Sequence, residues 1–136
     1  MIELPEYARV VRRLPPGDHA YLELLPHVDR SPAMARALPE LAQRARLLRE
    51  AKVQLRGGRG YAFIDVEAPC IVLSEWYYRE GADLDLYMDL LHELTHLRQL
   101  EEGFDLWDER FAYVDRPTEV EGYATSFVLE LPARTE

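Results

Sequence analysis

The chain has 136 residues, the usual size of a single domain, and 48% of them are apolar, so the sequence predicts one soluble globular domain over residues 1–136. Its net charge is −9, from 25 acidic against 16 basic side chains. An acidic surface repels phosphate backbones, so we expect no nucleic acid among its partners. No stretch approaches the roughly 18 consecutive apolar residues that a membrane span needs, and we expect no membrane partner.

One cysteine and the start of the chain bear on the cellular compartment. Cys70 is the only cysteine, so no internal disulfide can form, and its apolar neighbours predict a buried, inert thiol. Residues 1–6 are acidic and lack the hydrophobic core of a signal peptide. We therefore expect a cytoplasmic protein.

The N-terminal part, about residues 1–55, is expected to be mainly helical. Residues 5–14 indicate a short helix that two prolines and a glycine end at positions 15–17. Ser31-Pro32 is typical of a helix start, and the pattern stays helical to about Leu55, although Pro39 can split it. His19 and His27 lie in this part, and isolated histidines of this kind are more often surface or core residues than ligands.

The metal-site core, about residues 60–132, is expected to begin with a hairpin of residues 61–66 and 70–73. A long helix follows, from Asp83 as its cap to Glu102, and Gly103 ends it. Pro117 opens a last helix that runs to about Leu131. The sequence therefore predicts an α+β fold, with a small antiparallel sheet packed on two helices.

Residues 92–96 read His-Glu-Leu-Thr-His. Two imidazoles four positions apart on a helix lie on one face, so His92 and His96 can ligate the same metal ion. Glu93 would lie beside that ion, where a carboxylate can deprotonate a bound water. This is the HExxH arrangement of zinc-dependent peptidases, so we expect Zn²⁺ on His92 and His96 with Glu93 as the catalytic base.

A catalytic zinc site usually has a third protein ligand. The metzincin class would need glycine at 99 and histidine at 102, and this chain has Gln99 and Glu102, so that class is excluded. The remaining candidates are Glu119 and Glu121, in the first turns of the last helix.

Each candidate glutamate is followed three positions later by a small residue, which would let the two helices approach closely. These small residues are Gly122 after Glu119 and Ala124 after Glu121. Spacing leaves both glutamates open as the ligand, and the other could orient a ligating histidine.

The motif and the later Glu-x-x-small helix resemble the gluzincin class of metallopeptidases, and more closely the compact bacterial ImmA/IrrE-type family. The likeness covers about residues 60–132 and implies a minimal zincin-like domain that binds zinc. Matching Ala124 and Phe127 to the family pattern favours Glu121 as the ligand. The Pro-x-Glu start of the helix favours Glu119, and we prefer this alignment because a related pattern recurs in small zincin-like proteins.

The expected function is a zinc-dependent metallopeptidase that hydrolyses a peptide or protein substrate, with Glu93 as general base. The alternative is a zincin-like metal-binding module that regulates or binds a partner without catalysis. Tyr113, Arg116 and Tyr123 are candidates to stabilise an oxyanion. Cys70 at the metal as a fourth ligand would argue against catalysis, because structural zinc sites are usually closed.

Overall fold

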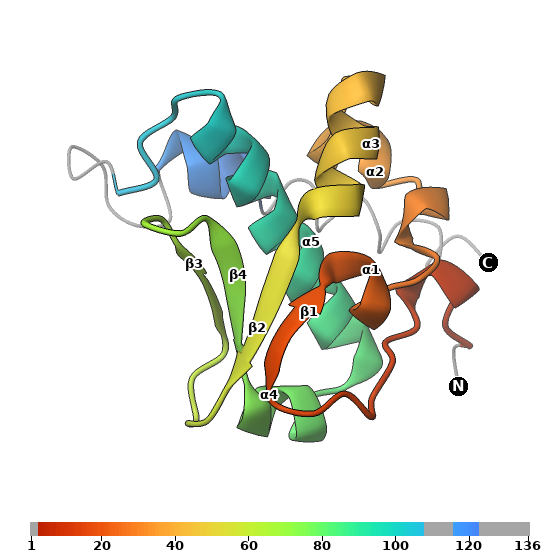
Figure 1. The fold of residues 1–136 in the computed structure, drawn as a ribbon. Helices are drawn as coiled ribbons and strands as arrows, with labels where there is room; N and C mark the ends of the chain where they lie inside the picture. Colours follow the sequence, from red (N-terminus) through yellow and green to blue (C-terminus); the bar gives the residue numbers. More distant parts are fainter. Residues whose placement is uncertain (1–2, 108–115, 123–136) are drawn as a thin grey trace.

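The computed structural model describes residues 3–107 and 116–122, and it shows a small α+β domain. A four-stranded sheet packs with one face against the long helix α5, and shorter helices surround the rest of α5 (Figure 1). The strands are β1 (Gly17–Ala20), β2 (Lys52–Arg56), β3 (Ala62–Asp65) and β4 (Cys70–Ser74). The helices are η1 (Glu6–Ala8), α1 (Tyr21–Leu24), η2 (Val28–Arg30), α2 (Met34–Ala37), α3 (Leu41–Glu50), α4 (Glu75–Glu80) and α5 (Asp83–Glu101). Residues 117–122 form a further short helix.

The sheet has the strand order β1-β2-β4-β3. β3 and β4 are antiparallel neighbours, with Phe63 opposite Val72, which confirms the predicted hairpin. β2 and β4 run parallel, and β1 is antiparallel to β2, so the sheet is mixed rather than the purely antiparallel sheet that we expected. The core lies between the sheet and α5, where alternate strand residues such as Val53, Ile64 and Ile71 are buried.

The N-terminal part contains the helices η1, α1, η2, α2 and α3, as the expectation of a mainly helical part requires, but also the strands β1 and β2, which were not predicted. Between residues 5 and 14 the chain forms only the short 3-10 helix η1. The predicted long helix is split near Pro39 into α2 and α3, α3 ends at Glu50, and β2 begins at Lys52. Val53 and Leu55 alternate with more exposed neighbours, and pairing with both β1 and β4 makes this short segment a strand.

Helix α5 carries the HExxH motif through the middle of the domain. Asp83, which we predicted as its cap, is instead its first residue. The N-cap is Ala82, and the Asp83 carboxylate accepts a hydrogen bond from Arg12 at 2.8 Å. Residues 90–99 are all buried. The helix ends before Gly103, whose φ of 89° lies in the left-handed region that favours glycine.

Two further sequence predictions concern Cys70 and the membrane. Cys70 is a buried free thiol in β4. None of the helices in residues 3–107 and 116–122 has the length and apolar character that a membrane span needs.

Candidate metal centre

The two histidines of the motif lie one turn apart on α5, and their Nε2 atoms are 3.0 Å from each other. Both rings are buried, and they meet edge to face with 4.6 Å between their centroids. Adjacent turns of a helix present side chains at i and i+4 on the same face, which is why this spacing brings the rings together. His92 and His96 therefore direct two nitrogen donors to one point.

Glu119, in the helix of residues 117–122, supplies an oxygen at the same point. Its Oε1 lies 2.7 Å from Nε2 of His92 and 2.9 Å from Nε2 of His96. The side chain is buried, and this short helix lies beside the C-terminal half of α5 (Figure 1). In the part of the chain that the structure describes, His92, His96 and Glu119 are the one group of potential ligands close enough to share an ion.

A glycine makes this close approach of the two helices possible. A β-carbon on Gly122 would stand 2.7 Å from Cε1 and 2.8 Å from Nδ1 of the His92 ring. Any larger residue would have to push either the ring or the helix away. Gly122, the small residue three positions after Glu119, therefore lies next to His92, which Glu119 contacts.

Glu121, the other candidate ligand, points to a different partner. Its Oε1 accepts a hydrogen bond from Nε2 of Gln99 at 2.7 Å, and its Oε2 is 2.7 Å from the guanidinium of Arg98. Gln99 in turn contacts His96. Glu121 therefore reaches His96 only through Gln99, whereas the Glu119 carboxylate contacts both histidines directly.

The chemistry of the donor set fits a bound cation. Oε1 of Gln99 lies 2.7 Å from Nδ1 of His96 and can only accept, so in a neutral ring the proton is on Nδ1. The lone pair of Nε2 then faces His92 and the Glu119 carboxylate. Lone pairs and a negative oxygen at such distances repel unless a positive charge lies between them, and nitrogen with carboxylate oxygen is a donor set that Zn²⁺ accepts.

Burial and mutual contact shift the pKa values of these groups. Burial acts to raise the pKa of Glu119, but its hydrogen bonds with His92 and His96 outweigh burial and lower this pKa to about 2. Burial acts to lower the pKa of His96, but hydrogen bonds with Glu119 and Gln99 and the charge of Glu93 raise it overall. The site therefore favours an ionised glutamate facing the two rings.

Glu93 is buried next to His92, His96 and Glu119, and its environment makes it a stronger base than an ordinary glutamate. Burial raises its pKa to about 6, although the charges of His96 and His92 act in the opposite direction. The negative charges of Glu119 and Asp89 also raise this pKa. A carboxylate with a pKa near neutrality can take up a proton from a reacting group and return it.

The other residues that the sequence analysis considered are Tyr113, Arg116, Tyr123 and Cys70. Tyr113 and Tyr123 fall outside the described residues, as do Ala124 and the rest of the last helix. The Arg116 guanidinium lies over the ring of Trp107, 5.9 Å from its centroid. Cys70, in β4 opposite Asp65, does not belong to the triad.

The two N-terminal histidines also lie away from the triad. His19 contacts Glu23 and the carbonyl of Pro15, and His27 lies 3.2 Å from Glu6. Neither is among the groups that could share an ion with the motif histidines.

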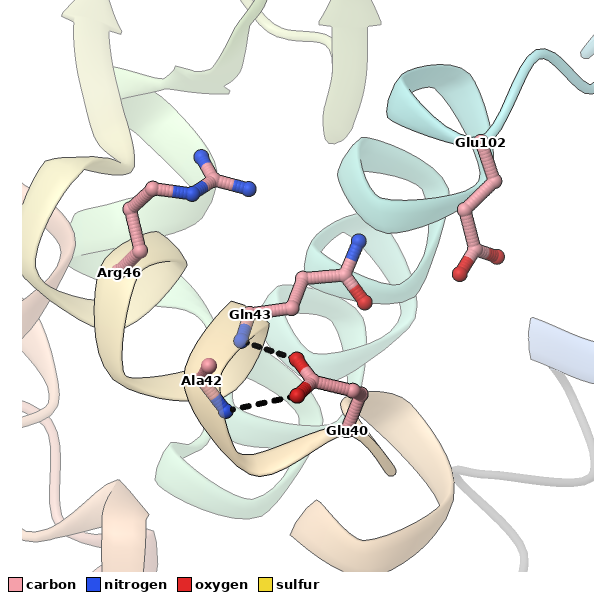
Figure 2. A pocket seen from close by; sticks show the side chains of 5 residues that line it. All are labelled: Glu40, Ala42, Gln43, Arg46 and Glu102. Atoms are coloured by element: carbon pink, nitrogen blue, oxygen red, sulfur yellow. Dashed lines mark hydrogen bonds between the residues drawn. The ribbon is translucent and has the colours of Figure 1, made fainter.

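A surface hollow lies between α3 and the end of α5 (Figure 2). Figure 2 shows Glu40 accepting hydrogen bonds from the backbone of Ala42 and Gln43, which caps α3. The other charged residues that line it are also engaged, Arg46 with Glu101 and Glu102 with Arg98. No residue of the triad lines this hollow, so its polar groups serve the structure around α3. Its residues are Glu40, Ala42, Gln43, Arg46 and Glu102.

We compared the chain with family models, curated proteins and solved structures. No family model matches the chain, and neither a curated protein nor a solved structure is significantly similar to it. The likeness to compact bacterial zincins thus depends on the motif residues and stays a prediction.

Sequence reasoning missed Gln99 as a functional residue. It used position 99 only to exclude a metzincin, but Gln99 is three positions after His96, a spacing that places both side chains on one helix face. It also missed Asp89, one turn before His92, which accepts a hydrogen bond from the hydroxyl of Tyr77. A search for polar residues three or four positions from each histidine would have found both.

Proposed function

We propose that this protein is a metal-dependent peptidase in which His92, His96 and Glu119 hold a zinc ion. The observation that carries the proposal is the convergence of two imidazole nitrogens and one carboxylate oxygen within 3.0 Å of one another. Three protein ligands are typical of catalytic zinc, which keeps a further position for water or substrate. When bound, zinc would supply Lewis-acid chemistry, because it acidifies water and polarises a carbonyl oxygen.

Glu93 is the general base in this proposal. As water adds its oxygen to the amide carbon, the Glu93 carboxylate accepts one proton. When the carbon–nitrogen bond breaks, Glu93 returns that proton to the leaving nitrogen, and the products are a carboxylic acid and an amine. The pKa of about 6 that burial imposes on Glu93 suits both steps near neutral pH.

The proposed substrate is a peptide or an extended segment of a protein. β3 is the last strand in the sheet order and pairs with β4 on one side, so its other edge faces no strand among the described residues. β3 also packs against α5, the helix that carries the motif. An extended chain could add to this edge through main-chain hydrogen bonds, which would place its amide groups alongside the motif helix.

We propose the cytoplasm as the place of this activity. The buried free thiol of Cys70 is compatible with a reducing compartment. The net charge of −9 supports a protein rather than a nucleic-acid substrate.

The test measures zinc and hydrolysis in the same preparations. Wild-type protein purified without chelator should contain about one zinc per chain, and it should cleave members of a peptide library. Glu93→Gln should keep the zinc and lose cleavage, because an amide cannot accept the proton. Glu50→Gln, an exposed change of the same kind on α3, is the matched control and should cleave like wild type.

Two outcomes would contradict the proposal at different points. Bound zinc without any Glu93-dependent cleavage would refute the peptidase and leave a metal-binding module. Protein that neither contains nor takes up zinc would refute the metal centre itself.

A further inference from the structure

Gln99 is a fully enclosed residue with four hydrogen-bonding positions, and three of them contact His96 and two residues that flank Glu119 in the chain. Its side chain is 1% exposed. Its Oε1 lies 2.7 Å from Nδ1 of His96, and its Nε2 donates to the carbonyl oxygen of Thr118 at 3.1 Å and to Oε1 of Glu121 at 2.7 Å. A single amide thus joins α5 to the helix that carries Glu119.

The two partners of the Gln99 nitrogen determine which way its amide faces. A backbone carbonyl and a carboxylate both accept hydrogen bonds, so the NH₂ group must face Thr118 and Glu121. The oxygen is then left to face His96, where it accepts the Nδ1 proton. In this tautomer Nε2 of His96 has a lone pair free for a metal, whereas the opposite tautomer would present a proton there.

The same amide also holds the third ligand. Thr118 and Glu121 lie on either side of Glu119 in the chain, and Gln99 binds the backbone of one and the side chain of the other. The position of the Glu119 carboxylate relative to the two rings therefore depends on Gln99 as well.

Glu121 is held from its other side by Arg98. The guanidinium lies 2.7 Å from Oε2 of Glu121, and its Nε donates to the carbonyl of Ala37 at the end of α2. Arg98 is itself 5% exposed, so its contacts with Glu121 and Ala37 connect the Gln99 amide to the core of the domain.

We propose that Gln99 is a positioning residue that sets the metal affinity of this site by acting on two ligands. Its oxygen holds His96 in the Nδ1–H tautomer, and its nitrogen holds the segment that carries Glu119. Glu121 and Arg98 keep the amide in the required orientation. The inference rests on the proposed metal centre, and its first measurement is made without any metal.

The first measurement is the tautomer of His96 in metal-free protein, read from nitrogen-15 NMR of the imidazoles. The chain has only four histidines, so each can be assigned by substitution. At a pH where the ring is neutral, wild type should show His96 as the Nδ1–H tautomer. Gln99→Met, which keeps the side-chain volume and removes the hydrogen bonds, should show the Nε2–H form or a mixture of the two.

The second measurement is zinc affinity by competition with a chelator. Gln99→Met should bind zinc about 10- to 100-fold more weakly than wild type, the usual cost of losing a group that orients a metal ligand. Gln43→Met is the matched control, because Gln43 also donates to a glutamate, Glu101, but lies on α3 in the hollow of Figure 2. Its zinc affinity should stay within twofold of wild type.

A double variant, Gln99→Glu with Glu121→Gln, separates positioning from packing. The new carboxylate can still accept the Nδ1 proton of His96, and the new amide at 121 can donate to it, but the donor to the Thr118 carbonyl is lost. Zinc affinity should therefore recover in part, to a value between those of Gln99→Met and wild type. If Gln99 served only to fill space, the volume-matched Gln99→Met would bind zinc better than this double variant, which introduces a buried charge.

The results distinguish this inference from the proposed function. Wild type that binds no zinc would refute the metal centre, and the NMR measurement would still decide the role of Gln99 in the tautomer. Wild type that binds zinc while Gln99→Met has the same affinity or the same tautomer would overturn the inference and leave the metal centre intact. If Gln99→Met fails to fold, recovery of the tautomer in the double variant decides the question.

Discussion

The backbone of Gly122 lies against the imidazole ring of His92, so close that a β-carbon would stand 2.7 Å from the ring. Real β-carbons do not approach other atoms to that distance, so a side chain here requires the ring or the helix to move. This contact places the Glu119 helix against the motif helix, and the position of the proposed third ligand depends on it.

Gly122→Ala should weaken zinc binding by about 10- to 100-fold, as expected when a group that orients a ligand is displaced. Alanine is the better helix former by about 1 kcal/mol, so a gain in stability without loss of zinc would contradict the steric argument. Chelator competition and thermal denaturation measure the two effects. Gly57→Ala is the control, because a β-carbon there meets nothing within 4 Å and the backbone is not left-handed.

Glu119→Gln and Glu121→Gln should differ sharply in zinc affinity, although the two changes are chemically identical. Loss of the charged oxygen at Glu119 removes a ligand and should weaken binding more than the roughly 100-fold upper range for orienting residues. Glu121→Gln keeps an oxygen that can accept from Gln99, and its affinity should fall less than tenfold. Equal losses would contradict the choice of Glu119 over Glu121, and the reverse order would make Glu121 the ligand.

In metal-free protein, Glu93 should make the free energy of unfolding fall as the pH rises, whereas most carboxylates in folded proteins make it rise. Burial raises the Glu93 pKa from 4.5 to about 6, so the folded state binds this proton more tightly than the unfolded state. The contribution to stability is complete below pH 4.5 and is lost as the pH rises through 6, at a cost of about 2 kcal/mol.

Urea denaturation of Glu93→Gln and wild type between pH 4 and 8, with chelator present, checks this dependence. The variant should be the more stable of the two at pH 7, and the difference should shrink as the pH falls below 6. A difference that does not change with pH would show that Glu93 titrates normally.

Zinc should stabilise the fold, because the triad joins α5 to the helix of residues 117–122 only when the chain is folded. At a free zinc concentration 100 times the Kd, the gain is about 2.7 kcal/mol. Urea denaturation with zinc and with chelator measures it at constant pH. His92→Gln should show little of this gain, and an equal gain in that variant would place the stabilising zinc elsewhere.

Much of the motif helix could be predicted from the sequence because its signals are local. The spacing of His92 and His96 determines that they share a face, and the glycine at 103 marks the end of α5. The β3–β4 hairpin was predicted for the same reason, since both strands and their turn lie within a few residues of one another.

β1 and β2 were missed because their strand structure depends on distant partners. His19 pairs with Val53, and Val53 pairs with Ile71, so each strand is completed by residues far away in the sequence. Local patterns around residues 40–55 favour a helix, and non-local pairing overrides them from Lys52 onward.

The sequence by itself determined that two histidines and a glutamate lie together on one helix, and that either Glu119 or Glu121 was the next candidate ligand. Both glutamates occupy the first turns of the same helix, so spacing could not choose between them. The tertiary structure separated them, because Gly122 brings the helix against His92 and directs Glu119 to the two Nε2 atoms. Buried Gln99 and Arg98 bind Glu121 and hold it away from that point, since each needs a partner for its polar atoms once it is removed from water.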